Sequence, residues 1–296
     1  MSSEWQTAPF SKFCDITRGA SPRPIHDYLS NEGMPWIKIA DATAENSRFI
    51  SSTKEKIKLD GVKASVKVFP EDLILSNSAT PGLPKFLKIE ACIHDGWMLL
   101  RNFRDLDSQF AYWLLLNERP RLVAQGNGSV FTNLKTEILK SHIVTVPPLS
   151  IQNDIAAMLN NLDDRITLLR ETNATLEAIA QTLFKSWFMD FDPVRAKSEG
   201  KPPEGMNEAT AALFPDAFEE TELGMVPRTW QASTLSSLAT FQNGYAFKGS
   251  DWVEQGHPVI KIGNVKPLLI DFEGCSYVSP ETVSVLEIGR ASCRER

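Results

Sequence analysis

The longest hydrophobic pattern in the chain lies between Ile151 and Trp187, with Pro147 and Pro148 before it and Pro193 after it. Apolar side chains recur there at alternating spacings of three and four residues, the pattern of a helix that packs along a coiled-coil seam. This pattern predicts a spacer helix over residues 148–190. One seven-residue series contains Ile155, Leu162, Leu169, Leu176 and Leu183, and the other contains Leu159, Ile166, Asn173, Ala180 and Trp187.

The seam predicts a partner helix, because an apolar row of this length needs a second surface to cover it. Asn173 is the polar member of the seam; such a residue lowers stability but fixes the register and orientation of the partner. The 37 residues from Ile151 to Trp187 extend over about 55 Å as a helix. The alternative is one long core helix inside a single domain.

Residues 1–147 have the pattern of a compact mixed domain. Short apolar runs separated by Gly and Pro predict strands at Phe13–Thr17, Trp36–Ile39, Val66–Phe69, Leu73–Leu75 and Ile143–Val146. An amphipathic helix is expected over Ser108–Glu118, capped by Asp107 and stopped by Pro120. The Gly- and Asn-rich segment Gln125–Asn133 predicts a loop.

The chain contains an internal repeat with a period of about 225 residues. The segment Trp5–Gly19 matches Trp230–Gly244, and Pro35–Asp41 matches Pro258–Asn264. A third, shorter match pairs Phe49–Ser51 with Tyr277–Ser279. These ordered matches predict a duplicated domain on either side of the spacer helix, the first copy in residues 1–147 and the second in residues 227–287.

Residues 191–226, between the spacer helix and the second copy, are acidic and Pro-rich, which predicts an extended linker with a short helical piece around Glu208–Phe214. The second copy ends before it reaches the length of the first, so we expect a C-terminally truncated chain. The final residues 288–296, IGRASCRER, have no counterpart in the first copy and are interpreted as a non-native tail.

The net charge of −6 is unevenly distributed. Residues 1–147 hold 18 basic and 16 acidic residues, residues 148–225 hold 6 and 14, and residues 226–296 hold 7 and 7. The acidic charge therefore belongs to the spacer and linker, and the first domain is free to present a local basic surface. No segment has the length and apolarity of a membrane span, so we expect a cytoplasmic protein without a membrane partner.

No catalytic constellation can be assembled from the sequence. The four histidines and four cysteines are scattered without metal-ligand spacing, and neither a nucleophile elbow nor a phosphate-binding loop occurs. We therefore expect no metal, no cofactor and no enzymatic activity in this chain.

Three segments resemble the specificity subunit of Type I restriction-modification systems. They are the start of the spacer at Val146–Leu149, its end at Ser186–Lys197, and the approach to the second copy at Leu213–Phe218 and Glu222–Pro227. Pro70–Gly82 is similar to the family's recognition-domain signature. The resemblance implies an α+β fold with duplicated target recognition domains joined by a long coiled-coil spacer helix. It also implies that the chain reads a bipartite double-stranded DNA site, and that it directs two modification (methyltransferase) subunits and the restriction (endonuclease) subunits without being catalytic.

The candidate DNA contacts are cations and short polar side chains in Gly-, Pro- and Ser-rich segments, where a scaffold displays its binding groups. They are Arg18, Arg23, Lys38, Ser76, Asn77, Ser78, Thr80, Lys85, Lys135 and Lys261. Lys261 repeats Lys38 in the second copy. The alternative function is a coiled-coil scaffold that assembles proteins without nucleic acid, which the acidic spacer favours.

Overall fold

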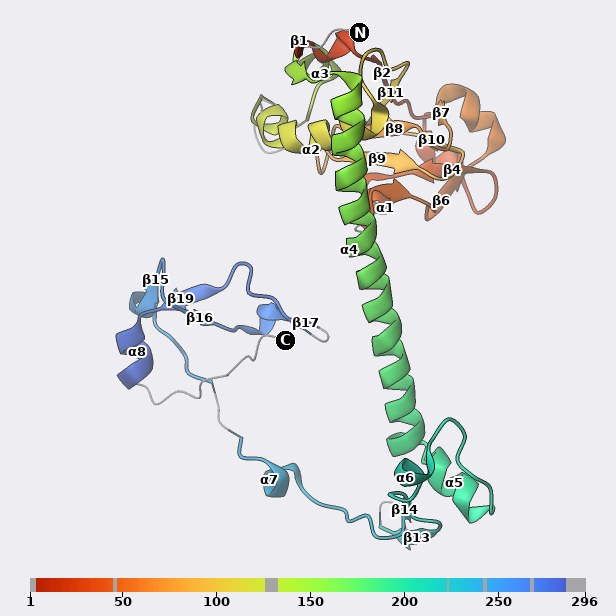
Figure 1. Ribbon diagram of the computed structural model, residues 1–296, viewed down its shortest axis with the longest axis vertical. Helices are drawn as coiled ribbons and strands as arrows, with labels where there is room; N and C mark the ends of the chain where they lie inside the picture. The colour runs from red at the N-terminus through yellow and green to blue at the C-terminus, as the bar shows by residue number, and fades with distance from the viewer. Residues whose placement is uncertain are drawn as a thin grey trace. The chain divides into compact units, whose positions relative to one another are not determined.

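The computed structural model describes residues 4–44, 47–125, 133–222, 224–241, 244–266 and 269–285, and it divides into two compact units, Met1–Leu183 and Phe184–Arg296. The first unit contains a mixed α and β domain and most of a long helix (Figure 1). This agrees with the predicted α+β class. Within the described residues no helix is both long and apolar enough to cross a membrane.

Two five-stranded sheets and a helical layer form the first domain. One sheet has the strand order β3-β6-β4-β10-β7 and the other β2-β11-β8-β9-β5, while β1 and β12 pair separately. The strands are β1 (Gln6–Pro9), β2 (Asp15–Arg18), β3 (Leu29–Ser30), β4 (Met34–Ile37), β5 (Phe49–Ile50), β6 (Glu55–Ile57), β7 (Val66–Val68), β8 (Leu73–Ser76), β9 (Pro84–Leu87), β10 (Ala91–Ile93), β11 (Trp97–Arg101) and β12 (Ile143–Val146). The helices are α1 (Ile39–Ala44), α2 (Ser108–Gln125), α3 (Thr136–Ser141) and α4 (Leu149–Phe184).

The core is divided between the two faces of the second sheet, because successive side chains of a strand point to opposite faces. Ile74 of β8 packs in the cluster between the sheets, together with residues of β4, β7 and β10. Its neighbours Leu73 and Leu75 pack in the other cluster, with residues of α2, α3 and α4. The order of layers is therefore sheet, sheet, helices, and all five predicted strands lie within or overlap this framework.

Helix α2 continues beyond its predicted end. Asp107 caps it as expected, since its carboxylate accepts a 2.8 Å hydrogen bond from the Phe110 amide. However, the helix continues through Pro120 to Gln125, so the prediction that Pro120 stops it was wrong. Leu122 lies fully buried in the core beyond the proline, and this tertiary packing outweighs the hydrogen bond that Pro120 removes. The predicted loop beyond Gln125 lies largely outside the described residues.

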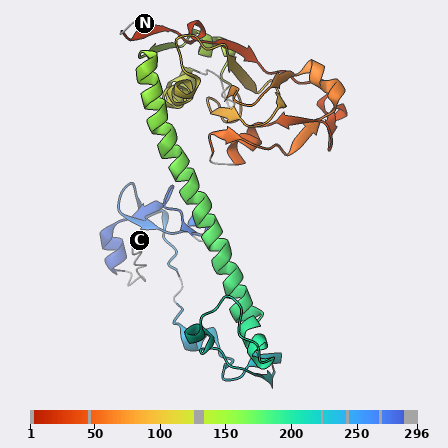
Figure 2. The ribbon, with the colours of Figure 1, turned by 45° about the vertical axis from the view of Figure 1, so that its right-hand side comes forward.

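The first turns of α4 are attached to the domain. Gln152 is fully buried; its amide donates to the carbonyls of Pro147 (2.7 Å) and Asp105 (2.9 Å), and its oxygen accepts from the Asp107 amide (2.8 Å). Trp113 of α2 donates to Asn160 of α4 at 3.0 Å, and Figures 1 and 2 both show these helices side by side. The α-helix ends at Phe184 and is followed directly by a π-helical turn, η4 (Lys185–Met189), within the predicted range 148–190.

The second unit contains structure where an extended linker was expected. Helices α5 (Asp192–Ser198) and α6 (Glu208–Ala211) are followed by the antiparallel pair β13 (Phe218–Thr221) and β14 (Gly224–Pro227). Aromatic contacts hold this segment in a folded form: the centroid of the Phe188 ring lies 5.9 Å from that of Phe214 and 6.1 Å from that of Trp230. The short helical piece predicted around Glu208 is confirmed.

The second copy repeats part of the first domain. Strands β15 (Trp252–Val253), β19 (Ser276–Val278) and β16 (His257–Val259) form an antiparallel sheet in the order β15-β19-β16, as β3-β6-β4 do in the first copy. The remaining elements of the second unit are α7 (Leu235–Leu238), β17 (Val265–Lys266), β18 (Leu269–Ile270) and α8 (Pro280–Val285).

One of the three sequence matches of the repeat was wrong. In the pairing, Pro35 lies opposite Lys56 and Pro258 lies opposite Tyr277. Strand β19 therefore corresponds to β6 and not to Phe49–Ile50, which form β5 in the other sheet. A three-residue match does not fix a strand's register; hydrogen-bonded partners do.

Candidate nucleic-acid interface

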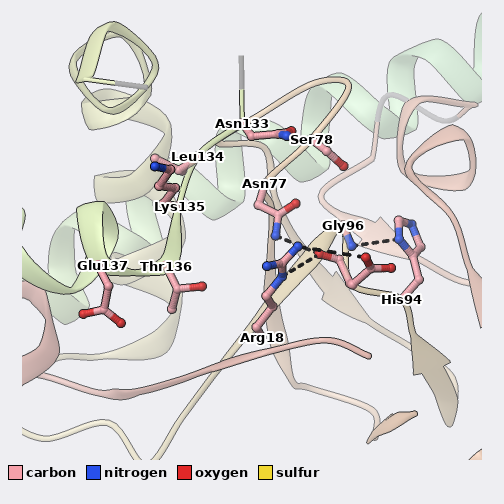
Figure 3. Close-up of a pocket in the computed structure, with 11 residues that line it drawn as sticks. Arg18, Asn77, Ser78, His94, Gly96, Asn133, Leu134, Lys135, Thr136 and Glu137 are labelled. Atoms are coloured by element: carbon pink, nitrogen blue, oxygen red, sulfur yellow. Dashed lines mark hydrogen bonds and ion pairs between the residues drawn. The ribbon is translucent and has the colours of Figure 1, made fainter. Parts of the chain in front are cut away.

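One edge of the second sheet brings together segments that are far apart in the sequence. Strand β11 lies between β2 and β8, so that Met98 faces Arg18 and Trp97 faces Ser76. The end of β2, the end of β8 and the start of β11 therefore meet at this edge. The turn His94–Gly96, which joins β10 to β11, lies at the same place (Figure 3).

Asn77 holds this turn. Its backbone amide donates to the Gly96 carbonyl at 2.8 Å, and its side-chain amide donates to the Asp95 carbonyl at 2.9 Å. Its own carbonyl accepts from the Leu134 amide at 2.8 Å, which ties the segment before α3 to the edge. Asn77 is buried, so its amide orders the turn and does not project from the surface.

The Asp95 carboxylate is the centre of the polar contacts. Ser21 Oγ donates to it at 2.6 Å, and Arg23 lies 3.5 Å from it. Arg18 Nε donates to the Asp95 carbonyl at 3.0 Å, with its Nη2 3.9 Å from the carboxylate. The hydrogen bond from Ser21 is the main cause that lowers the pKa of Asp95 below its usual value, so this side chain is ionised at neutral pH.

Two adjoining hollows flank the turn. The first, of about 600 Å³, contains four of the predicted DNA contacts, Arg18, Asn77, Ser78 and Lys135. The second, of about 910 Å³, contains Arg23 and Lys38 and is walled by apolar side chains, among them Ile25, Trp36 and Ile39. Both hollows share Ser78, His94 and Asp95. Six of the ten predicted contacts are thus gathered around one turn.

The cations of this edge are exposed and weakly held. The side chains of Arg18 and Arg23 are 61% and 79% exposed, and ion pairs of this kind contribute little free energy in water. Lys38 pairs with Glu55, which is also partly exposed. Arg18 and Arg23 can therefore exchange their carboxylate partner for phosphate oxygens at little cost, and charge-assisted hydrogen bonds to phosphate are strong.

The other predicted contacts lie elsewhere. Ser76 is buried; its hydroxyl donates to the Thr80 carbonyl and accepts from the Leu83 amide, so it stabilises the turn after β8. Thr80 is half-buried in that turn and lines neither hollow. Lys85 is buried, with its ammonium group donating to the Ser47 carbonyl. Lys85 was selected because it lies beside a Gly- and Pro-rich segment, but it belongs to the buried strand β9, and the Ser47 carbonyl accepts from it there.

Lys261 stands in the second copy as Lys38 does in the first. The backbone amide of Lys38 donates to the Asp41 side chain at 2.8 Å, and that of Lys261 donates to the Asn264 side chain at 3.0 Å. The side chains differ in their partners: Lys38 faces a carboxylate, whereas Lys261 donates to Ser276 Oγ at 2.6 Å and lies 4.6 Å from the Trp252 ring centroid.

Four further residues line the hollows and were not predicted from the sequence: His94, Asp95, Ser21 and Thr136. The available signal was the segment His94-Asp95-Gly96 between two short apolar runs, which is a turn pattern. Within the ranges that the structure describes, no three His, Cys, Asp or Glu side chains form a group that could hold a metal ion.

The predicted helix interface divides into three parts. Ile155 packs partly against the core of its own domain, and Leu159 is half-buried. From Leu162 onward the seam is exposed in this chain, at Leu162, Ile166, Leu169, Asn173, Leu176 and Leu183. Trp187 lies on the π-helical turn, where the i to i+5 spacing interrupts the seven-residue series, and its ring packs edge-on against Phe214 at 5.9 Å.

Comparison with characterised proteins finds similar chains, among them two specificity subunits of Type I restriction enzymes. The chain is similar to the Type I restriction enzyme HindI specificity subunit of Haemophilus influenzae, with 26% identity over 76% of this chain and 58% of the relative. It is also similar to the Type I restriction enzyme MjaIX specificity subunit of Methanocaldococcus jannaschii, with 26% identity over 81% of this chain and 53% of the relative. The chain thus spans little more than half the length of these relatives.

Among solved structures, the HsdS subunit from Thermoanaerobacter tengcongensis matches with a TM-score of 0.45 and 20% identity, over 64% of this chain and 45% of that chain. A Type I restriction-modification S subunit from M. genitalium matches with a TM-score of 0.46 and 16% identity, over 87% and 59%. A family model described as the Type I restriction modification DNA specificity domain matches residues 2–178, more than half of the chain. The chain belongs to this family of DNA specificity domains.

Proposed function

We propose that this chain is the DNA sequence-recognition subunit of a Type I restriction-modification complex. The observation that carries the proposal is the convergence of Arg18, Arg23, Lys38 and Lys135 on one edge of a domain of this family. Their charges suit the phosphates on either side of a groove, and phosphate contacts fix the register of a protein on the duplex. Ser78 and His94, between these cations, are then the groups that face the bases.

The repeat extends this proposal to a bipartite site. The first domain reads one half-site and the second copy, in which Lys261 takes the place of Lys38, contributes to the other. A helix of 36 residues, α4, spans about 54 Å, enough to separate half-sites by one or more turns of B-DNA. The proposed partners are two modification subunits and the restriction subunits, in the cytoplasm, with all catalysis supplied by those partners.

A scaffold without nucleic acid is the second candidate, because α4 exposes an apolar row and residues 148–225 are strongly acidic. Both features favour contacts with protein. A direct measurement of DNA binding separates the two candidates.

The experiment measures the affinity of the chain, co-expressed with modification subunits, for a random-sequence duplex pool over a range of salt concentrations. The double variant Arg18→Ala/Lys135→Ala should reduce the slope of log K against log salt by about 2, since each lost phosphate contact removes about 0.9. Lys56→Ala/Lys63→Ala, which removes two exposed cations outside both hollows, is the matched control and should leave the slope unchanged. Salt-independent or undetectable binding by the unmodified complex would favour the scaffold.

A further inference from the structure

His94 lies where the two hollows meet, and its hydrogen bond determines which ring nitrogen carries the proton. The Gly96 backbone amide donates to His94 Nδ1 at 2.8 Å (Figure 3). Because Nδ1 is the acceptor, the proton of the neutral ring is on Nε2. Burial is the main cause that lowers the pKa of His94, which favours this neutral form. The ring is thus an uncharged donor at Nε2.

The fold holds this ring in one position. A Cβ at residue 96 would lie 2.2 Å from His94 Cε1 and 2.8 Å from Ser78 Oγ, so only glycine leaves room for the ring. The Trp36 ring lies on another side, with its centroid 6.0 Å from that of His94. No hydrogen bond to His94 Nε2 is formed by any of the described residues, although the ring lines both hollows. A pre-organised donor is therefore available to a bound molecule.

The surroundings of His94 suit an uncharged acceptor. The ionised carboxylate of Asp95 is the next side chain along the turn, and it repels a phosphate at this position. A neutral ring also lacks the charge that attracts phosphate. In contrast, the base edges of the major groove present uncharged acceptors, namely guanine N7 and O6, adenine N7 and thymine O4. The apolar wall formed by Ile25, Trp36 and Ile39 suits the flat apolar face of a base better than a phosphate, which the cations at the rim can hold.

We propose that His94 is a specificity-determining residue that donates a hydrogen bond from Nε2 to an acceptor on a base edge of the bound duplex. The proposal rests on the DNA-binding function proposed above. In this arrangement Arg18 and Lys135 neutralise phosphates at the rim, while Gly96 and Asn77 act as positioning residues that hold the reading group.

The test selects bound duplexes from a random-sequence pool with the chain in complex with modification subunits, and compares the base frequencies at each position. His94→Asn should lower affinity for the selected site about tenfold and relax selection at one or two adjacent base pairs, because its amide stops short of the Nε2 position. His94→Gln, whose amide nitrogen reaches that position, should retain most of the selection. The salt slope should be the same in all three proteins, since no phosphate contact is lost.

Gly96→Ala supplies an independent variant, because it keeps the His94 side chain but moves its ring away from the reading position. It should relax the same base pairs as His94→Asn, and melting curves check that both variants remain folded. A uniform loss of affinity for all sequences with a smaller salt slope would assign His94 to a phosphate and overturn the proposal. An unchanged selection profile would overturn it as well. If the unmodified complex selects no sequence at all, the proposed function itself fails.

Discussion

Arg48 and Asp163 lie 115 residues apart in the chain, and Arg48 Nη1 donates to Asp163 Oδ2 at 2.8 Å. The same nitrogen lies 2.8 Å from the carboxylate of Asp164. Burial opposes the charge on Arg48, but hydrogen bonds to Asp164 and Asp163 outweigh it and raise its pKa. Since Gln152 and Asn160 make the other polar contacts of α4 with the domain, three successive stretches of the helix are fixed by side-chain hydrogen bonds.

Arg48→Ala should destabilise the first unit by about 3 kcal/mol, because it leaves two carboxylates without their buried partner. This is the lower end of the range for buried pairs, since the Asp164 side chain is 62% exposed. The measurement is urea denaturation of the full chain followed by tryptophan fluorescence. Lys67→Ala, which breaks the exposed pair with Glu90, is the control and should cost about 1 kcal/mol or less. Equal effects of the two substitutions would contradict the assigned role of Arg48.

The elements that were predicted from the sequence are those with a clear local pattern. The seven-residue series predicted α4, and short apolar runs separated by Gly and Pro predicted strands such as β8 and β12. Strands β10 and β11, which are buried on both faces as β8 is, were not predicted.

The site required information that no local pattern contains. Arg18 and Ser78 could be selected as polar groups in or beside Gly-, Pro- and Ser-rich segments, but their proximity to His94 follows from the pairing of β11 with both β2 and β8. The burial of Lys85 has the same origin, because its acceptor, the Ser47 carbonyl, comes from a distant segment. The acceptor of Ser76 is local, the Thr80 carbonyl in the turn after β8.

Leu169→Asp should weaken assembly through the α4 seam without unfolding the first unit. Leu169 is 56% exposed in this chain, so an aspartate there meets water until a partner helix covers it, and burial of the unpaired charge then costs several kcal/mol, roughly. The matched control is Leu168→Asp, because Leu168 is 62% exposed but lies outside both seven-residue series. Gel filtration of the complex with modification subunits measures assembly. The seam assignment fails if both variants assemble equally well.

Acidification should destabilise the first domain through His94. The pKa of His94 in the folded protein is lowered, mainly by burial, so between that pKa and the ordinary histidine value of 6.5 the unfolded chain binds more protons. The contribution of neutral His94 to the free energy of unfolding therefore has its full value above pH 6.5. This contribution is lost as the pH falls towards the pKa of His94 in the folded protein. Asp95 and Asp41 partly offset this loss, whereas Lys38 adds to it. Urea midpoints measured from about pH 7.5 to about pH 5.5 should fall less steeply for His94→Gln than for the unsubstituted chain. Parallel profiles would refute the burial argument.

Two glycines test whether the sheets of the two copies are equivalent. A Cβ on Gly33 would lie 2.3 Å from the Ile57 carbonyl oxygen, and a Cβ on Gly256 would lie 2.3 Å from the Val278 carbonyl oxygen. Ile57 of β6 and Val278 of β19 are the residues that the strand pairing makes equivalent. Each glycine thus permits the same close approach of two backbone segments.

Gly33→Ala and Gly256→Ala should each destabilise their own sheet by about 2 kcal/mol or more, because backbone atoms must move in both cases and Gly33 also has a φ of +117°. Amide hydrogen exchange of the full chain separates the two effects: Gly33→Ala should accelerate exchange in β4 and β6, and Gly256→Ala in β16 and β19. Gly263→Ala, whose Cβ would meet nothing within 4 Å, should change exchange by no more than about 0.5 kcal/mol. If Gly256→Ala behaves like Gly263→Ala, the second copy does not form the sheet that β3, β6 and β4 form in the first, and the correspondence of Lys38 with Lys261 loses its structural basis.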